Sequence, residues 1–138
     1  MLADTSAWYV AQRSLRTLEA FRALLVEGQI AICDMVKLEL LHGARNPADF
    51  ARRRDELDAL PQCATGPAEW KRALDVYGEV CRRGPGNDAH RRINHQDLLI
   101  AATAEAADET VLHYDADYDT IAEVTGQPSR WIVPRGSQ

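Results

Sequence analysis

Hydrophobic positions along the chain alternate between short apolar runs and longer stretches with helical spacing. The short runs predict strands, over residues 1–3, 30–33, 62–65, 110–114 and 130–133. In the segments between them, apolar residues recur every three or four positions, which is the spacing of one helix face. The predicted helices cover residues 7–27 with a break near Ser14, then 35–44, 47–60, 66–83, 96–107 and 118–124.

This order of elements predicts an α/β fold. Strands that alternate with helices form βαβ units, which build a mostly parallel sheet covered by helices on both faces. Gly28 suits the end of the first helical stretch, and Pro47 suits the first turn of a later one. Residues 84–88 have the composition of a loop. No repeat, low-complexity tract or linker interrupts residues 1–138, so we expect a single domain.

The composition is that of a globular protein rather than a disordered or membrane one. Of 138 residues, 46% are hydrophobic and 27% are charged. The longest apolar run, near residues 98–102, is far shorter than the roughly 20 residues that span a bilayer, and the N-terminus lacks the basic region of a signal peptide. The three cysteines disfavour a disulfide framework and fit a reducing cytoplasm. The net charge of −5 argues at first against a nucleic-acid partner.

Several aspartates stand where a parallel sheet places its chemistry. Asp4 and Asp115 directly follow predicted strands, and sites in such sheets form at the carboxyl ends of the strands. Asp97 opens a nearly all-apolar helix that must be largely buried, so its first turn faces something enclosed. Each acid also has an ordinary alternative, because Asp4, Asp97 and Asp117 could all serve as helix caps or first-turn acids.

Glu39 has the strongest argument of its own. At about 100° per residue, Lys37 and Glu39 lie on nearly opposite faces of a helix that is apolar almost all round. At most one of the two can easily face water, and a buried carboxylate is costly unless a cation or hydrogen-bond donors compensate it. The alternatives are that Glu39 is the exposed one or pairs with Arg45.

Together these acids predict a metal site. Carboxylates in a low-dielectric cleft repel one another, so a cluster of Asp4, Glu39, Asp97 and Asp115 persists only with bound cations or shared protons. Ligation by oxygen alone favours Mg²⁺, with Mn²⁺ as a substitute, over zinc. The four histidines show no paired arrangement that would suit a metal-free ribonuclease. Much of the negative charge would then be located where cations bind.

The sequence resembles the PIN-domain ribonucleases, and among them the VapC-type toxins of bacterial type II toxin–antitoxin pairs. Four fragments carry this resemblance in order along essentially the whole chain, namely residues 2–8, 37–45, 96–104 and 112–119. It implies a three-layer α/β/α domain in which Asp4, Glu39, Asp97 and Asp115 bind metal and Asp117 is a further contributor. The chain departs from the pattern at His113, where a Thr or Ser is common.

The function that the resemblance implies is a Mg²⁺-dependent endoribonuclease acting as a toxin, with RNA, a VapB-type antitoxin and a second copy of the chain as partners. We expect Asp4 and Asp97 to hold the principal ion, while Asp115 and Glu39 complete its ligands or orient the attacking water. The RNA could be a transfer RNA, a ribosomal loop or a messenger RNA.

Substrate contacts are also predicted outside the acids. An arginine-rich segment leads towards Asp97, so Arg91 and Arg92 are expected to contact RNA phosphates, unless the segment is only solvated. Ser6 could hydrogen-bond a carboxylate or the scissile phosphate, or only start the first helix.

Two rival functions remain. A phosphatase of the haloacid-dehalogenase type usually needs a second aspartate two residues after the first, where Ser6 stands. A PIN-like module that binds RNA or protein without cutting is the other, and the intact set of acids argues against it.

Overall fold

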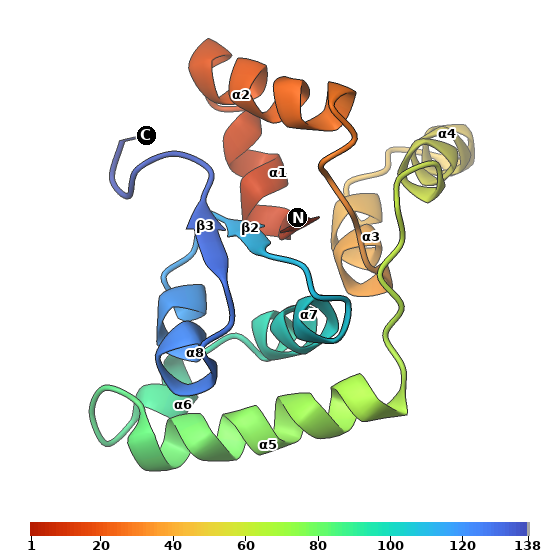
Figure 1. Cartoon of the computed structure of the whole chain (residues 1–138). Coiled ribbons are helices and arrows are strands. Elements are labelled where there is room, and N and C mark those ends of the chain that lie inside the picture. Colours follow the sequence, from red (N-terminus) through yellow and green to blue (C-terminus); the bar gives the residue numbers. More distant parts are fainter. Residues whose placement is uncertain (138) are drawn as a thin grey trace.

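The structure is a computed structural model, and it describes residues 1–137. Helices make up most of the chain (Figure 1). In chain order the elements are β1 (Leu2–Ala3), α1 (Thr5–Ala11), α2 (Leu15–Val26), α3 (Asp34–Leu41), α4 (Pro47–Asp58), α5 (Pro67–Arg83), α6 (Ala89–Arg92), α7 (His95–Ala106), β2 (Val111–His113), α8 (Asp117–Thr125) and β3 (Ser129–Trp131). None of the helices in residues 1–137 is both long and apolar enough to cross a membrane.

The sheet is parallel, as predicted, and its strands are ordered β1-β2-β3. The predicted strands over 30–33 and 62–65 are wrong in extent, because each segment forms only isolated bridges. Ala31 bridges Leu2, and Ile32 bridges Gln62, both in parallel. A longer ladder is prevented because Pro61 has no N–H to donate and because the chain enters α3 directly after Cys33. These bridges still extend the sheet beyond β1.

Alternation along the strands builds a separate core on each face of the sheet. Leu2 and Val111 belong to a core shared with α3, α4, α5, α7 and α8, whereas Ala3 and Leu112 belong to a core shared with α1 and α2. Figure 1 shows α1 and α2 on one side of the strands and α5, α7 and α8 on the other. The predicted three-layer α/β/α arrangement is therefore confirmed.

Local signals place the helix ends close to their predicted positions. Ser14 caps α2 by accepting a hydrogen bond from the Thr17 N–H, which explains the break in the first helical stretch. Gly28 follows α2 with a φ of +67°, a conformation that favours glycine. Asn46 caps α4 directly before Pro47. The short helix α6 was not predicted, because its segment contains more arginine than apolar residues.

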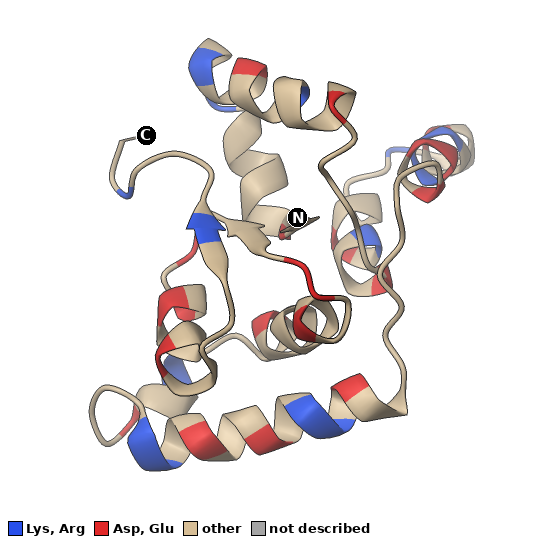
Figure 2. Cartoon of the chain, in the orientation of Figure 1, with Lys and Arg blue, Asp and Glu red and all other residues tan. Residues whose placement is uncertain are grey.

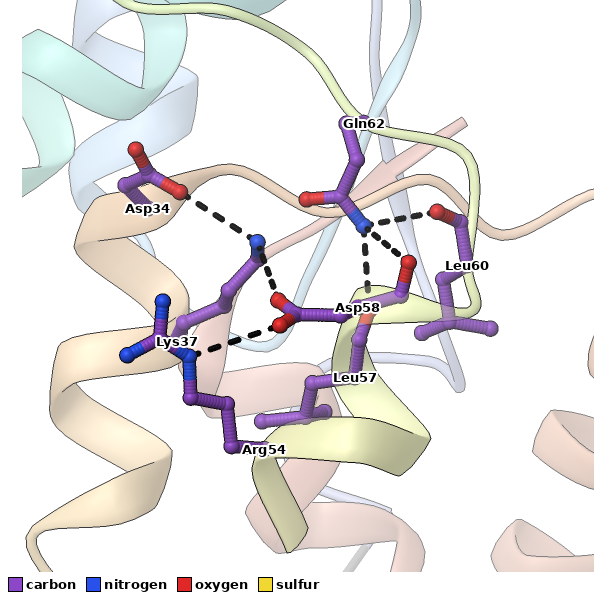
Figure 3. A network of polar contacts seen from close by, with 7 residues as sticks. All are labelled: Asp34, Lys37, Arg54, Leu57, Asp58, Leu60 and Gln62. Carbon is purple, nitrogen blue, oxygen red and sulfur yellow. Dashed lines mark hydrogen bonds and ion pairs between the residues drawn. The ribbon is translucent and has the colours of Figure 1, made fainter. Parts of the chain in front are cut away.

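The helix α3 is oriented by a polar network with α4 (Figure 3). Lys37 Nζ lies 2.8 Å from Asp58 Oδ1 and 3.3 Å from Asp34 Oδ1. Burial alone would lower the pKa of Lys37, but the hydrogen bonds to Asp58 and Asp34 raise it. Arg54 also binds Asp58, over 3.4 Å. Since Lys37 faces α4, Glu39 faces the other way, as predicted.

Candidate metal centre at the carboxyl end of the sheet

Asp4 directly follows β1 and is the N-cap of α1. The capping role given as its alternative is therefore compatible with a place in the site. Its side chain is 3% exposed, and Oδ2 accepts hydrogen bonds from the Ser6 N–H over 2.8 Å and from the Ser6 hydroxyl. The Ser6 hydroxyl oxygen in turn accepts a hydrogen bond from the Tyr114 N–H over 2.9 Å. Ser6 thereby fastens the Asp4 carboxylate to the end of β2.

Asp97 lies in the first turn of α7 and is the most enclosed acid of the site after Asp4. It is 5% exposed, and its Oδ2 has no hydrogen-bond partner among the described residues. Burial, and then the charges of Asp4, Asp115, Asp117 and Glu39, raise its pKa to about 9. This carboxylate is therefore poorly compensated by the protein itself.

Asp115 and Asp117 follow β2 and complete a tight group with Asp97. One carboxylate oxygen from each of the three lies within 4.8 Å of the others. Asp117 does not cap α8; instead its Oδ2 accepts a hydrogen bond from the Asn94 N–H over 2.9 Å, and its own N–H donates to Asp115 Oδ1. Burial raises the pKa of Asp117. Asp117, which the resemblance implies only as a further contributor, therefore belongs to this group of three acids.

Glu39 approaches the group from α3. It is half-buried, and its Oε2 accepts a hydrogen bond from the Thr5 hydroxyl. It lines an open cleft of about 470 Å³ together with residues that include Tyr9, His42 and Gln96. Arg45, the alternative partner, pairs with Asp49 instead.

The five acids lie together without any lysine or arginine to balance them. Among residues 1–137, no ion pair involves Asp4, Glu39, Asp97, Asp115 or Asp117. Elsewhere charges of both signs share the same helices, as Figure 2 shows for α4 and α5. The unpartnered Oδ2 of Asp97 and the all-oxygen donor set fit a hard divalent cation such as Mg²⁺.

The other predicted contacts lie at the margin of this group. Arg91 and Arg92 are exposed on α6, and Arg92 donates to the Pro85 carbonyl over 2.6 Å. Two residues after the end of α6, the Asn94 N–H donates a hydrogen bond to Asp117, so the C-terminal end of α6 lies next to the acids. His113 is fully buried; its Nδ1 accepts a hydrogen bond from the Asp115 N–H over 3.2 Å, and burial lowers its pKa. The His113 ring therefore stabilises the backbone at Asp115 through this hydrogen bond.

The contacts of Tyr118 with the acids were not predicted from the sequence. Its hydroxyl donates to Asp4 Oδ1 over 2.8 Å and lies 3.4 Å from Asp97 Oδ1. Thr5, which donates to Glu39, was missed too. No spacing rule could have found either, because both bonds join residues that are distant in sequence.

Comparison with known proteins gives consistent matches. A family model described as the PIN domain matches residues 1–124. Ribonuclease VapC18 of Mycobacterium tuberculosis is 42% identical over 134 residues, covering 97% of this chain and 96% of the relative. Ribonuclease VapC51 of the same species is 38% identical over 118 residues, covering 86% and 82%.

Solved structures share the fold at low sequence identity. The DNA-bound VapBC complex from Salmonella typhimurium matches with a TM-score of 0.69 and 15% identity, covering 96% of this chain and 97% of that one. A toxin–antitoxin complex from Klebsiella pneumoniae matches with a TM-score of 0.68 and 18% identity, with the same coverage.

Proposed function

The chain belongs to the PIN-domain family, in its group of VapC ribonucleases, and on that premise we propose that it is a Mg²⁺-dependent endoribonuclease and the toxin of a toxin–antitoxin pair. The observation that carries this proposal is the cluster of acids around Asp97, which has no balancing base in the described chain. The relatives at 42% and 38% identity are named ribonucleases.

The acids divide the work of hydrolysis between them. Asp97, Asp115 and Asp117 lie close enough together to hold one cation, and Asp4 approaches Asp97 through the Tyr118 hydroxyl. A divalent cation held by these residues would neutralise phosphate charge, lower the pKa of water and stabilise the leaving oxygen. Mn²⁺ would substitute for Mg²⁺ because it accepts the same oxygen ligands.

Glu39 has a different role from the tight group. Its carboxylate lines the open cleft, and the Thr5 hydroxyl holds one of its oxygens. From there it would accept a hydrogen bond from the attacking water and orient it towards phosphorus. The water oxygen would then form a bond to phosphorus as the bond between phosphorus and the leaving oxygen breaks. The water would give up a proton to solvent and the leaving oxygen would take one up, with no protein nucleophile involved.

Substrate contacts come from outside the acid cluster. The exposed Arg91 and Arg92 on α6 would bind RNA phosphates next to Asp117. Replacing both with glutamine would weaken RNA binding and lower its dependence on salt; an unchanged salt dependence would exclude the contact. Of the two hydrogen-bond partners predicted for Ser6, a carboxylate and the scissile phosphate, the structure supports the carboxylate, because the Ser6 hydroxyl donates to Asp4.

Two macromolecular partners complete the proposal. The matched structures are toxin–antitoxin complexes, and a VapB-type antitoxin is the corresponding partner here. We also propose a homodimer and a cytoplasmic location, where the RNA is found. Light scattering of the isolated chain should give twice its mass, and co-expression with the antitoxin should abolish cleavage. A monomer, or cleavage unaffected by the antitoxin, would contradict these two points.

The decisive experiment compares RNA cleavage by metal-free and Mg²⁺-loaded protein. After removal of metal with EDTA the wild type should leave RNA intact, and Mg²⁺ should restore cleavage at sites defined by 5′-end mapping. Asp4→Ala should stay inactive under both conditions. Cleavage that persists in EDTA or in Asp4→Ala would refute the metal-dependent reaction, and a wild type inactive in Mg²⁺ would favour a PIN-like binding module.

A further inference from the structure

Tyr118 places a hydroxyl between two of the proposed cation ligands. The residue lies in the first turn of α8 and is 1% exposed. Its hydroxyl donates to Asp4 Oδ1 over 2.8 Å and lies 3.4 Å from Asp97 Oδ1. One side chain thereby joins α8 to the end of β1 and to the start of α7.

The ring and the hydroxyl of Tyr118 have separable roles. The ring belongs to the hydrophobic core, and its centroid lies 5.0 Å from that of His113. A phenylalanine ring would fill the same space. A buried hydroxyl is costly unless it is hydrogen-bonded, and the partners of this one in the described structure are carboxylates. The acids, rather than packing, therefore explain the hydroxyl.

The two carboxylates differ in how firmly they are held. Asp4 is bound at both oxygens, by Ser6 at Oδ2 and by Tyr118 at Oδ1. Among the described residues, the Tyr118 hydroxyl is the hydrogen-bond partner of Asp97 Oδ1, and the buried Oδ2 of Asp97 has none. Two like charges in such a space repel each other. A donor between them stabilises the charge of Asp4 and keeps the two oxygens within reach of one atom.

We propose that Tyr118 is a positioning residue whose hydroxyl holds Asp4 and Asp97 together and so preforms the cation site before an ion binds. The inference rests on the proposed function, because it takes these acids as cation ligands. Groups that hydrogen-bond metal ligands commonly set ligand orientation in this way. At 1% exposure the hydroxyl has no access to RNA, so its effect acts through the carboxylates alone.

The test uses Tyr118→Phe in the full chain, with Tyr77→Phe as the matched control. Tyr77 is a half-buried tyrosine of α5 that packs against His90 and His95. Titration calorimetry of the EDTA-treated proteins with Mn²⁺ should give Tyr118→Phe an affinity about tenfold weaker than the wild type, and Tyr77→Phe an unchanged one. The Mg²⁺ concentration for half-maximal cleavage should rise in parallel, whereas the rate at saturating Mg²⁺ should stay close to the wild-type rate.

Equal Mn²⁺ affinities of Tyr118→Phe and the wild type would overturn the positioning role and leave the proposed function standing. A wild type that binds no Mn²⁺ would overturn the cation site itself. Should Tyr118→Phe fail to fold, NMR of the wild type with labelled tyrosine decides the matter. A slowly exchanging Tyr118 hydroxyl proton in the metal-free protein supports a preformed bridge, and a rapidly exchanging one contradicts it.

Discussion

Two buried aspartates in different parts of the molecule have opposite electrostatics. Asp49 on α4 is 7% exposed and Asp97 on α7 is 5% exposed, so the exposed fraction does not distinguish them. Asp49 accepts a hydrogen bond from the Arg45 N–H and lies 2.7 Å from Arg52 and 3.1 Å from Arg53, and these contacts hold its pKa well below its usual range. Asp97 has no such base among residues 1–137, and burial together with the neighbouring acids raises its pKa to about 9.

This difference separates acids that are balanced within the scaffold from acids that have no lysine or arginine partner among the described residues. Asp34, Asp49 and Asp58 are balanced by the protein's own bases, as Asp58 is by Lys37 in Figure 3. The acids at the carboxyl end of the sheet are not, although they are just as costly to bury. Under the proposed function a bound cation is their partner, and variants of Asp49 and Asp97 test this contrast.

The largest expected effect is on RNA cleavage. Asp97→Asn removes a carboxylate from the tight group, and its initial rate at saturating RNA in Mg²⁺ should fall by about a hundredfold or more. Asp49→Asn removes an acid of the same burial and should keep the wild-type rate at a temperature where both variants are folded. Similar losses in both variants would break the distinction between the two acids.

The second expected effect is on the free energy of unfolding of the metal-free proteins at neutral pH, which the Asp97 and Asp49 variants should change in opposite directions. With a folded-state pKa near 9, Asp97 must take up a proton when the metal-free protein folds at neutral pH, and Asp97→Asn removes this cost; a shift of one pKa unit corresponds to about 1.4 kcal/mol. It should therefore raise the free energy of unfolding by more than about 1 kcal/mol. Asp49→Asn takes the paired acid away from Arg45, Arg52 and Arg53 and should lower the free energy of unfolding. Urea unfolding in EDTA measures both free energies. A change in the same direction in the two variants would contradict the proposed difference between Asp97 and Asp49.

The pH dependence of stability should separate the same two acids. The folded-state pKa of Asp97 lies near 9, above its ordinary value of 3.8, so its contribution to stability is present in acid and is lost as pH rises from about 4 to about 9. The pKa of Asp49 is lowered, so its contribution is present above about pH 4 and is lost on acidification. Metal-free wild type should therefore lose stability from pH 5 to 9 more steeply than Asp97→Asn, and Mg²⁺ should flatten the slope. Identical slopes for the two proteins would count against the raised pKa.

The smallest expected effect concerns Lys37, the base that balances Asp34 and Asp58 outside the site. Lys37→Met breaks the pairs with Asp34 and Asp58 but keeps the aliphatic stem of the side chain. Partly exposed ion pairs contribute little, so unfolding should become easier by no more than about 1 kcal/mol. RNA cleavage should be unaffected, because Lys37 faces α4 and not the acids. A marked loss of cleavage in the folded variant would show that the network does more than orient α3.

The fold was predictable where local chemistry decides it. Ser14, Gly28 and Pro47 mark helix ends through capping and backbone conformation, which short stretches of sequence reveal. The extent of the sheet was not predictable, because the apolar runs at 30–33 and 62–65 do not show how many residues will pair. Only the neighbouring strands decide that, and here they allow isolated bridges.

The site shows the same limit at the level of side chains. Asp4, Glu39, Asp97 and Asp115 were predicted from strand ends, helix faces and family resemblance, and the structure brings them together. Their roles as ligands stay a prediction. The Tyr118 hydroxyl contacts acids 21 and 114 positions away in the sequence, so only the folded chain reveals it.

The central claim is that the acids without bases form the cation site. Titration calorimetry of EDTA-treated wild type, Asp97→Asn and Asp49→Asn with Mn²⁺ tests this claim most directly. The account predicts equal binding by the wild type and Asp49→Asn, and an affinity about a hundredfold weaker or worse for Asp97→Asn. Undiminished Mn²⁺ binding by Asp97→Asn, or none by the wild type, would contradict it.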